Sequence, residues 1–318
     1  MRAGVAIACA LLAGGCGATA ATLLASNNPP YTAQPTPSPP YGVGERIITF
    51  VDYSRHIRLP DGSVVPRTLQ TIIRYPACGP RSEVDVNGAR IAPGRFPLVI
   101  FGHGFAVTPY PYRKLLRSWA SAGFIVAAPV FPLENANAPG GPNESDLIHQ
   151  PRDMSFVITQ MLRDRLFNSS IVPGEVAVSG QSDGAMTALA TAYDSAYRDS
   201  RVRAAVVLSG AELPYGAFTF PAAGSSPPLL ASQGTADTIN LPFYTYQFFN
   251  QAPRPKFLLQ LLGAHHLPPY TYEQPQLGVV ERVSIAFLDL YLTHDRRQAA
   301  QIRRWGNVGG VAALTADP

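Results

Sequence analysis

Lysine is almost missing from this 318-residue chain, which contains only Lys114 and Lys256. Charged residues of both signs make up just 14% of the sequence, and the arginines behind the formal net charge of +4 are scattered along it. Proteins that bind nucleic acids usually carry a basic stripe with interleaved aromatic residues. The sequence has no such stripe, so we expect no nucleic-acid partner.

Cysteine is also scarce, with three residues in the whole chain. Cys9 and Cys16 lie in an apolar N-terminal segment, which leaves Cys78 as the only cysteine of the predicted folded part. One cysteine cannot form a disulfide framework within that part. Cys78 lies in a Pro- and Gly-containing turn without a nearby histidine, so we expect an inert thiol and not a catalytic one.

No run of 18 or more apolar residues follows the N-terminal segment, so no further membrane span is expected. The N-terminus itself has Met1-Arg2, an apolar stretch over 3–12, and then Ala13-Gly14-Gly15-Cys16. This pattern predicts a signal peptide over residues 1–16. A Cys after Ala-Gly-Gly resembles the lipobox of bacterial lipoproteins, which implies lipidation of Cys16 and a membrane anchor. Cleaved secretion and an uncleaved anchor over Ala3–Ala25 stay open, and each of the three exports the protein.

Residues 17–44 are rich in proline and have no periodic apolar face, which predicts an extended linker. The remaining residues, 45–318, suit one domain, because hydrophobic residues make up 46% of the chain and supply a substantial core. Oligomeric state cannot be derived from this composition.

Short apolar segments alternate with amphipathic ones from about residue 95 onward, as in a parallel sheet covered on both faces. The expected strands are Pro97–Phe101, Phe124–Ala128, Glu175–Ser179, Ala204–Leu208, Pro228–Ser232 and Phe257–Leu261. The expected helices are Tyr112–Ala122, one that opens at Pro151 or Arg152, Asp183–Tyr197 and Val279–Leu292. This order predicts an α/β fold with a mostly parallel, doubly wound sheet and no large lid domain. Arg46–Asp52 and Leu69–Tyr75 are expected as antiparallel strands at one edge.

The strongest chemical signal is Gly180-Gln181-Ser182-Asp183-Gly184, a Gly-x-Ser-x-Gly motif between a predicted strand and a predicted helix. The two glycines suit a sharp turn where the backbone passes close to its neighbours. Ser182 would then project from the carboxyl end of the sheet as a nucleophile. The alternative is an ordinary Gly-rich turn with a solvated serine.

A serine nucleophile needs a histidine base, which a carboxylate must orient. His265 and His266 both follow the predicted strand Phe257–Leu261, in a loop that suits this base. Asp237 follows the strand Pro228–Ser232 and is the first choice for the acid, with Glu212 the second. A simple turn-capping role for Asp237 is the alternative.

The segment Gly102-His103-Gly104-Phe105 ends the first core strand. His-Gly motifs at this place resemble the oxyanion loop of esterases, which implies the N–H groups of Phe105 and Asp183 as oxyanion donors. We expect His103 to be structural, and we expect Phe105 and Gln181 to contact substrate. We expect the loop 129–143 and the aromatic stretch Tyr244–Phe249 to cover the site.

Together these motifs resemble the bacterial cutinase and dienelactone-hydrolase-like branch of the α/β-hydrolases, and they are similar to the chlorophyllase and platelet-activating-factor acetylhydrolase relatives. The matching pieces are Phe96–Phe105, Gly180–Gly184, Asp237-Thr238-Ile239 and Gly263-Ala264-His265-His266. The resemblance implies an α/β-hydrolase fold, with Asp237 as the acid and His266 as the base. Gln181 and Asp183 stand where that branch has His and Met, and Cys78 alone cannot form its C-terminal disulfide. The resemblance therefore implies a general carboxylesterase.

The sequence thus predicts an exported serine hydrolase that cleaves small or lipidic carboxylic esters with Ser182, Asp237 and His266. No metal or organic cofactor is expected, because adjacent histidines without a further ligand cluster do not suit zinc. An acyltransferase or peptidase on the same fold, or a ligand-binding lipoprotein without catalysis, are the alternatives.

Overall fold

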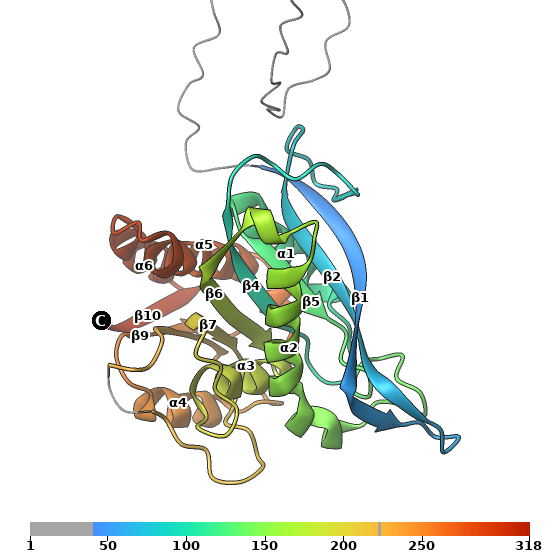
Figure 1. The fold of residues 1–318 in the computed structure, drawn as a ribbon. Coiled ribbons are helices and arrows are strands. Elements are labelled where there is room, and N and C mark those ends of the chain that lie inside the picture. Colours follow the sequence, from blue (N-terminus) through green and yellow to red (C-terminus); the bar gives the residue numbers. More distant parts are fainter. Residues whose placement is uncertain (1–40, 222–223) are drawn as a thin grey trace, which may run out of the picture.

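A single mixed sheet of ten strands organises the computed structural model, which describes residues 41–221 and 224–318. The strand order is β10-β9-β8-β7-β6-β4-β5-β2-β1-β3 (Figure 1). The predicted signal peptide, Cys16 and nearly all of the predicted linker lie outside the described residues. The linker's last residues, from Gly42 on, already belong to β1.

The centre of the sheet consists of parallel strands that coincide with the six predicted ones to within a few residues. They are β4 (Phe96–Gly102), β5 (Ile125–Pro129), β6 (Ile171–Gln181), β7 (Val202–Leu208), β8 (Leu229–Gly234) and β9 (Lys256–Leu261). Every residue of β4, β5 and β8 is buried. Such strands must be covered on both faces, and this explains why their sequences are continuously apolar.

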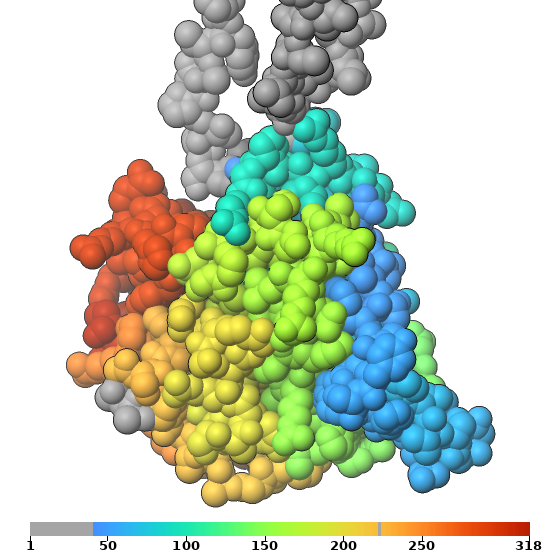
Figure 2. Space-filling model, in the orientation of Figure 1, coloured from blue at the N-terminus to red at the C-terminus, as the bar shows by residue number. Residues whose placement is uncertain are grey.

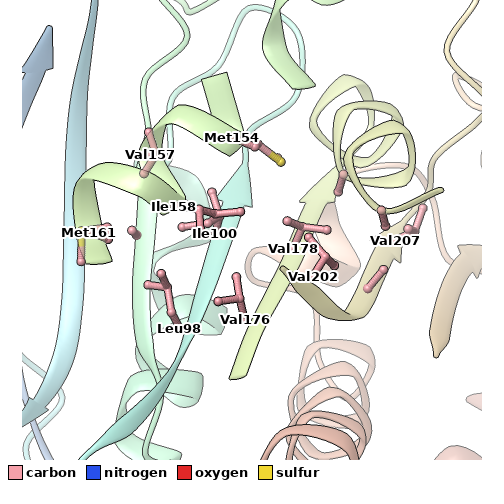
Figure 3. Packing of buried hydrophobic residues seen from close by; sticks show 14 of the residues in the cluster. Leu98, Ile100, Met154, Val157, Ile158, Met161, Val176, Val178, Val202 and Val207 are labelled. Atoms are coloured by element: carbon pink, nitrogen blue, oxygen red, sulfur yellow. The ribbon is translucent and has the colours of Figure 1, made fainter. Parts of the chain in front are cut away.

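Helices cover both faces of the sheet and bury two separate apolar clusters. On one face lie α1 (Arg113–Ala122), α5 (Gln276–Leu288) and α6 (Gln298–Gly306). On the other face lie α2 (Gln150–Arg163), α3 (Asp183–Tyr193) and α4 (Pro242–Gln251). In Figure 3, Val157 and Ile158 of α2 lie over Leu98 and Ile100 of β4. The predicted α/β fold class is confirmed.

One edge of the sheet is a long antiparallel hairpin of β1 (Gly42–Arg58) and β2 (Val64–Ala77), as predicted. The two-residue strand β3 (Val86–Asn87) pairs with β1. The far end of the hairpin, drawn in blue, extends beyond the rest of the molecule (Figure 2). At the opposite edge, β10 (Ala312–Asp317) runs antiparallel to β9.

Some parts of the fold differ from the sequence prediction. Helices α4 and α6 and strand β10 were not predicted. Helix α3 ends at Tyr193 and not at Tyr197, because Asp194 is extended and its side chain accepts a hydrogen bond from the Ala196 amide at 3.0 Å. Helix α5 ends at Leu288 and continues as a π-helical turn over Asp289–Thr293.

Cys78 is disulfide-bonded in the structure. The expectation of an inert thiol at Cys78 is therefore wrong. Across the described residues, no helix has both the length and the apolar character that a membrane crossing needs.

Strand register places four functional loops at one edge of the sheet. Gly102 of β4 is level with Gly180 of β6, Gln181 is level with Leu208 of β7, and Gly234 of β8 is level with Leu261 of β9. All these strands are parallel, so their carboxyl ends meet at the same edge. In open α/β sheets this edge is where ligands bind.

Candidate active site

The turn between β6 and α3 is built for close backbone contact. Ser182 has φ 58° and ψ −123°, an unusual conformation for a residue with a side chain. A Cβ on Gly180 would lie 2.0 Å from the Gly184 carbonyl oxygen, and a Cβ on Gly184 would lie 2.1 Å from the Gly102 carbonyl oxygen. Both glycines are therefore required. The strain at Ser182, of order 1–3 kcal/mol, is held by the surrounding packing.

Ser182 lies half-buried at the tip of this turn. Its amide donates to the Leu208 carbonyl at 3.0 Å, which ties the turn to the end of β7. A Cβ on Gly104 would lie 3.1 Å from the Cβ of Ser182, so the loop after β4 passes directly beside the serine. No hydrogen bond involves the Ser182 hydroxyl within the described residues, so the hydroxyl can turn toward a base.

Asp237 and His266 meet in the loops after β8 and β9. Nδ1 of His266 lies 2.7 Å from Oδ2 of Asp237, and both residues are buried. The other carboxylate oxygen of Asp237 accepts the amides of Ile239 and Asn240 at 2.9 and 3.0 Å. Burial by itself would raise the pKa of Asp237, but the hydrogen bond and charge of His266 and these two amides hold it below its ordinary value. Asp237 is thus an ionised partner that fixes the imidazole.

The two alternative residues that the sequence left open have other partners. Nδ1 of His265 faces the Ala236 carbonyl at 3.0 Å, and the ring is exposed. Glu212 accepts a hydrogen bond from Gln251 at 2.8 Å. Within the described residues, His265 forms no hydrogen bond with Asp237, and Glu212 forms none with His266. The structure therefore pairs His266 with Asp237.

Gln181 connects the serine turn to His266. Its side-chain nitrogen donates to the backbone carbonyl of His266 at 3.1 Å and lies 3.2 Å from Nε2 of the same residue. Its side-chain oxygen accepts the Tyr112 hydroxyl at 2.7 Å. Gln181 is 1% exposed, so its environment favours an internal role over the substrate contact that we expected.

Tyr112 was predicted only as one member of an apolar helix face. In the structure it directly precedes α1, is fully buried, and its hydroxyl also accepts the Gly104 amide at 3.3 Å. A single residue therefore links the loop after β4 to Gln181. The signal in the sequence was the hydroxyl itself, because a buried tyrosine usually needs a hydrogen-bond partner.

The predicted oxyanion loop follows β4. Ala106 has φ 55°, and within the described residues the amide of its neighbour Phe105 donates to no acceptor. Asp183 is the first residue of α3, so helix geometry leaves its amide without an intrahelical acceptor. Two N–H groups are therefore available near Ser182 for a developing negative charge.

His103 of this loop has an internal role, as expected. It is fully buried, and its Nε2 accepts the Phe131 amide at 3.0 Å. Its Nδ1 lies 2.8 Å from the Gly104 carbonyl. Burial lowers the pKa of His103 to about 4, against the opposing effect of the Gly104 bond, so the ring is neutral at pH 7. His103 braces the loop and supplies no charge.

An open cleft of about 440 Å³ lies between the serine helix and the acid loop. Met186, one turn after Ser182, lines one side, and Ile239 and Asn240 line the other. Tyr244, from the stretch predicted as a cover, also lines this cleft. Phe248 and Phe249 of that stretch are instead buried in the core, so the predicted cover is correct only in part. Apolar substrate groups suit this cleft.

Among the described residues, no group of three or more His, Cys, Asp and Glu side chains is arranged to hold a metal ion.

Two comparisons with known proteins agree with this geometry. Residues 85–210 match the chlorophyllase family. A solved ferulic acid esterase from Streptomyces cinnamoneus shares the fold with a TM-score of 0.64, over 89% of this chain and 98% of its own, at 20% identity. No curated protein matches the chain in sequence. The fold match spans nearly the whole domain, so the chain shares the α/β fold of this esterase.

Proposed function

We propose that the protein is a serine hydrolase that cleaves carboxylic esters through an acyl-enzyme. In this proposal Ser182 is the nucleophile, His266 is the general base and Asp237 orients the base. The observation that carries the proposal is the buried bond of 2.7 Å between His266 and Asp237, in which the other ring nitrogen lies beside Gln181, the residue before Ser182. The chlorophyllase match and the ferulic acid esterase fold support the same reaction class.

In the proposed reaction each step uses one group of the site. With Nδ1–H donating to Asp237, Nε2 of His266 has a lone pair that can take the Ser182 proton as Oγ attacks the ester carbonyl carbon. The amides of Phe105 and Asp183 stabilise the oxyanion. His266 then gives the proton to the leaving alcohol, and water hydrolyses the acyl-enzyme by the reverse sequence. No metal or organic cofactor takes part.

The proton transfer requires Nε2 to exchange partners. In the free protein it faces the Gln181 amide, and in the reacting complex it must accept from Ser182. Gln181 can keep His266 in place during this exchange, because its amide also donates to the His266 carbonyl. Catalytic hydrogen bonds often tighten only when substrate is bound.

The test is hydrolysis of p-nitrophenyl acetate and butyrate by Ser182→Ala. We expect turnover to fall by about 10⁴- to 10⁶-fold if the three residues act as a unit. His266→Ala and His265→Ala form a matched pair, because only His266 contacts Asp237. A loss of similar size in His266→Ala and near wild-type turnover in His265→Ala is the expected pattern. Unchanged turnover in Ser182→Ala would refute the proposal.

The same proposal covers export through residues 1–16 and lipid attachment at Cys16. Labelling of the wild type with palmitate, compared with Cys16→Ala, tests the anchor. A sulfur that carries a lipid cannot also form a disulfide. Mass analysis of the mature protein without reducing agent therefore measures lipidation and the bond at Cys78 together.

A further inference from the structure

Two buried acidic side chains meet beside the serine turn. Glu134, in the loop after β5, is fully buried, and Asp183, the first residue of α3, is 5% exposed. Their carboxyl groups lie close enough for each to act on the other. Both oxygens of Glu134 and Oδ2 of Asp183 are buried and accept no hydrogen bond from the described residues. Among these residues, no cationic side chain forms an ion pair with either carboxyl group.

A single proton would remove the repulsion between the two carboxylates. Two ionised carboxylates in contact would repel each other, whereas a carboxylic acid can donate to a carboxylate. Burial raises the pKa of Glu134 to about 10, and the charge and hydrogen bond of Asp183 add to this effect. Glu134 is thus the natural carrier of the proton at neutral pH.

Among the described residues, the titratable groups that act on this pair carry no positive charge, and Asp146 is already paired with Arg67. They are Asp146 and Glu144 on the 3-10 helix η2 (Glu144–His149), Tyr215 after β7 and Tyr112 before α1.

The pair also joins the two segments that carry the proposed oxyanion donors. The Glu134 carbonyl accepts the Ala106 amide at 3.0 Å, and the Val107 carbonyl accepts the Ala136 amide at 3.1 Å. Ala106 follows Phe105, the first donor, and Asp183 supplies the second donor from its own amide. The side chains of Glu134 and Asp183 therefore lie between the two segments that carry the proposed donors.

We propose that Glu134 and Asp183 are positioning residues that share one proton, and that this hydrogen bond holds the two oxyanion donors at their working distance. Loss of the proton would place a second negative charge beside the developing oxyanion and push the two segments apart. The inference rests on the proposed ester hydrolysis. It adds the expectation that kcat falls at alkaline pH.

The test is the pH profile of kcat and KM for Glu134→Gln and Glu134→Ala. The Gln amide can donate to Asp183 at every pH, so this variant should lack the fall in kcat that the wild type shows as the pH approaches about 10. Glu134→Ala removes the donor, and we expect kcat to fall by about 10- to 100-fold with little change in KM. The Gln variant should recover most of that loss. Glu144→Gln, the same change at an exposed site nearby, is the matched control.

A spectroscopic measurement separates this inference from the proposed function. Glu281 and Asp289 have pKa values raised by burial to about 7. At a pH between 7 and 10, infrared difference spectra of the wild type against Glu134→Gln should show the band of one protonated carboxyl group. An absent band, or an alkaline limit that persists in Glu134→Gln, would overturn the inference while Ser182-dependent hydrolysis stands. Loss of Ser182 dependence would instead remove the proposed function.

Discussion

Two buried acidic sites lie close together along the chain, and their carboxyl groups have different kinds of partner. Beneath the β1–β2 hairpin, Arg67 donates to all four carboxylate oxygens of Asp146 and Asp153 at 2.6–2.8 Å. Beside the serine turn, Glu134 and Asp183 have only each other. At the first site the two carboxylates pair with the guanidinium groups of Arg67 and Arg55, and at the second we propose that the two acids share one proton. Charge that serves only the fold is paired, whereas charge near the reaction is left able to change.

The backbone shows the same contrast. Ala106, Ser182 and Ser209 have positive φ angles, and they follow β4, β6 and β7 at the carboxyl edge of the sheet. In the β1–β2 hairpin only a glycine, Gly62, has a positive φ. Among the described residues, three of the four non-glycine residues with a positive φ lie at the edge where the proposed chemistry takes place, the fourth is His294 after α5, and the hairpin has none.

The largest predicted effect is a difference in kcat between two substitutions, one at Asp237 in the proposed active site and one at Asp61 in the hairpin. Asp237→Asn should lower kcat by about 10⁴-fold, because the amide no longer holds His266 in the tautomer with a free Nε2. Asp61→Asn, in the exposed turn of the hairpin, should leave kcat unchanged. Steady-state kinetics on a p-nitrophenyl ester checks both variants. Equal activity of the two would erase the contrast between the regions.

Removal of the Arg67 guanidinium should lower the stability of the fold and leave kcat unchanged. Arg67→Met leaves Asp146 buried without a cation and Asp153 with Arg55 alone, which should lower the free energy of unfolding by about 3–5 kcal/mol. Urea denaturation measures this change, with Arg58→Met on the exposed side of the same hairpin as the control. The folded fraction of Arg67→Met should retain the wild-type kcat. A stable but inactive Arg67→Met would show that the two sites are coupled.

The proton-sharing pair should make stability depend on pH. The pKa of Glu134 is raised by burial from 4.5 to about 10, so between these values the folded state holds a proton that the unfolded state has lost. Its contribution to stability is complete below about pH 4.5 and falls as the pH rises, by at most about 1.4 kcal/mol per pH unit. Unfolding free energies of the wild type and Glu134→Gln should diverge with increasing pH, in favour of the variant. Parallel curves would contradict the proposed protonation.

The smallest predicted effect concerns the link through Tyr112. Tyr112→Phe removes the hydroxyl that joins Gly104 and Gln181, a loss of about 1 kcal/mol for one neutral hydrogen bond. We expect about a fivefold lower kcat and a loss of stability of about 1–2 kcal/mol, while the ring still packs against Phe101. Kinetics and thermal denaturation check the two parts separately. A change in KM alone would instead indicate a role in substrate binding.

Local patterns in the sequence determined much of the fold. Continuous apolar segments predicted the six central strands, because a strand that is covered on both faces has no solvent-exposed face and therefore no alternation of polar and apolar residues. The same reasoning missed α4, whose aromatic residues suggested a cover over the site and are partly core, and α6, whose only fully buried apolar residue is Ile302. Helices with few buried positions give a weak periodic signal.

The sequence by itself also determined the glycines around Ser182 and the short set of candidate acids and bases, because turn geometry and reactive side chains are properties of a few neighbouring residues. Only the tertiary structure decided that Asp237 faces His266 and not His265, that Gln181 points inward, that Cys78 is disulfide-bonded and that Glu134 meets Asp183. These contacts join loops that are far apart in the chain. Strand register brings the loops together, and no local pattern encodes the register of a parallel sheet.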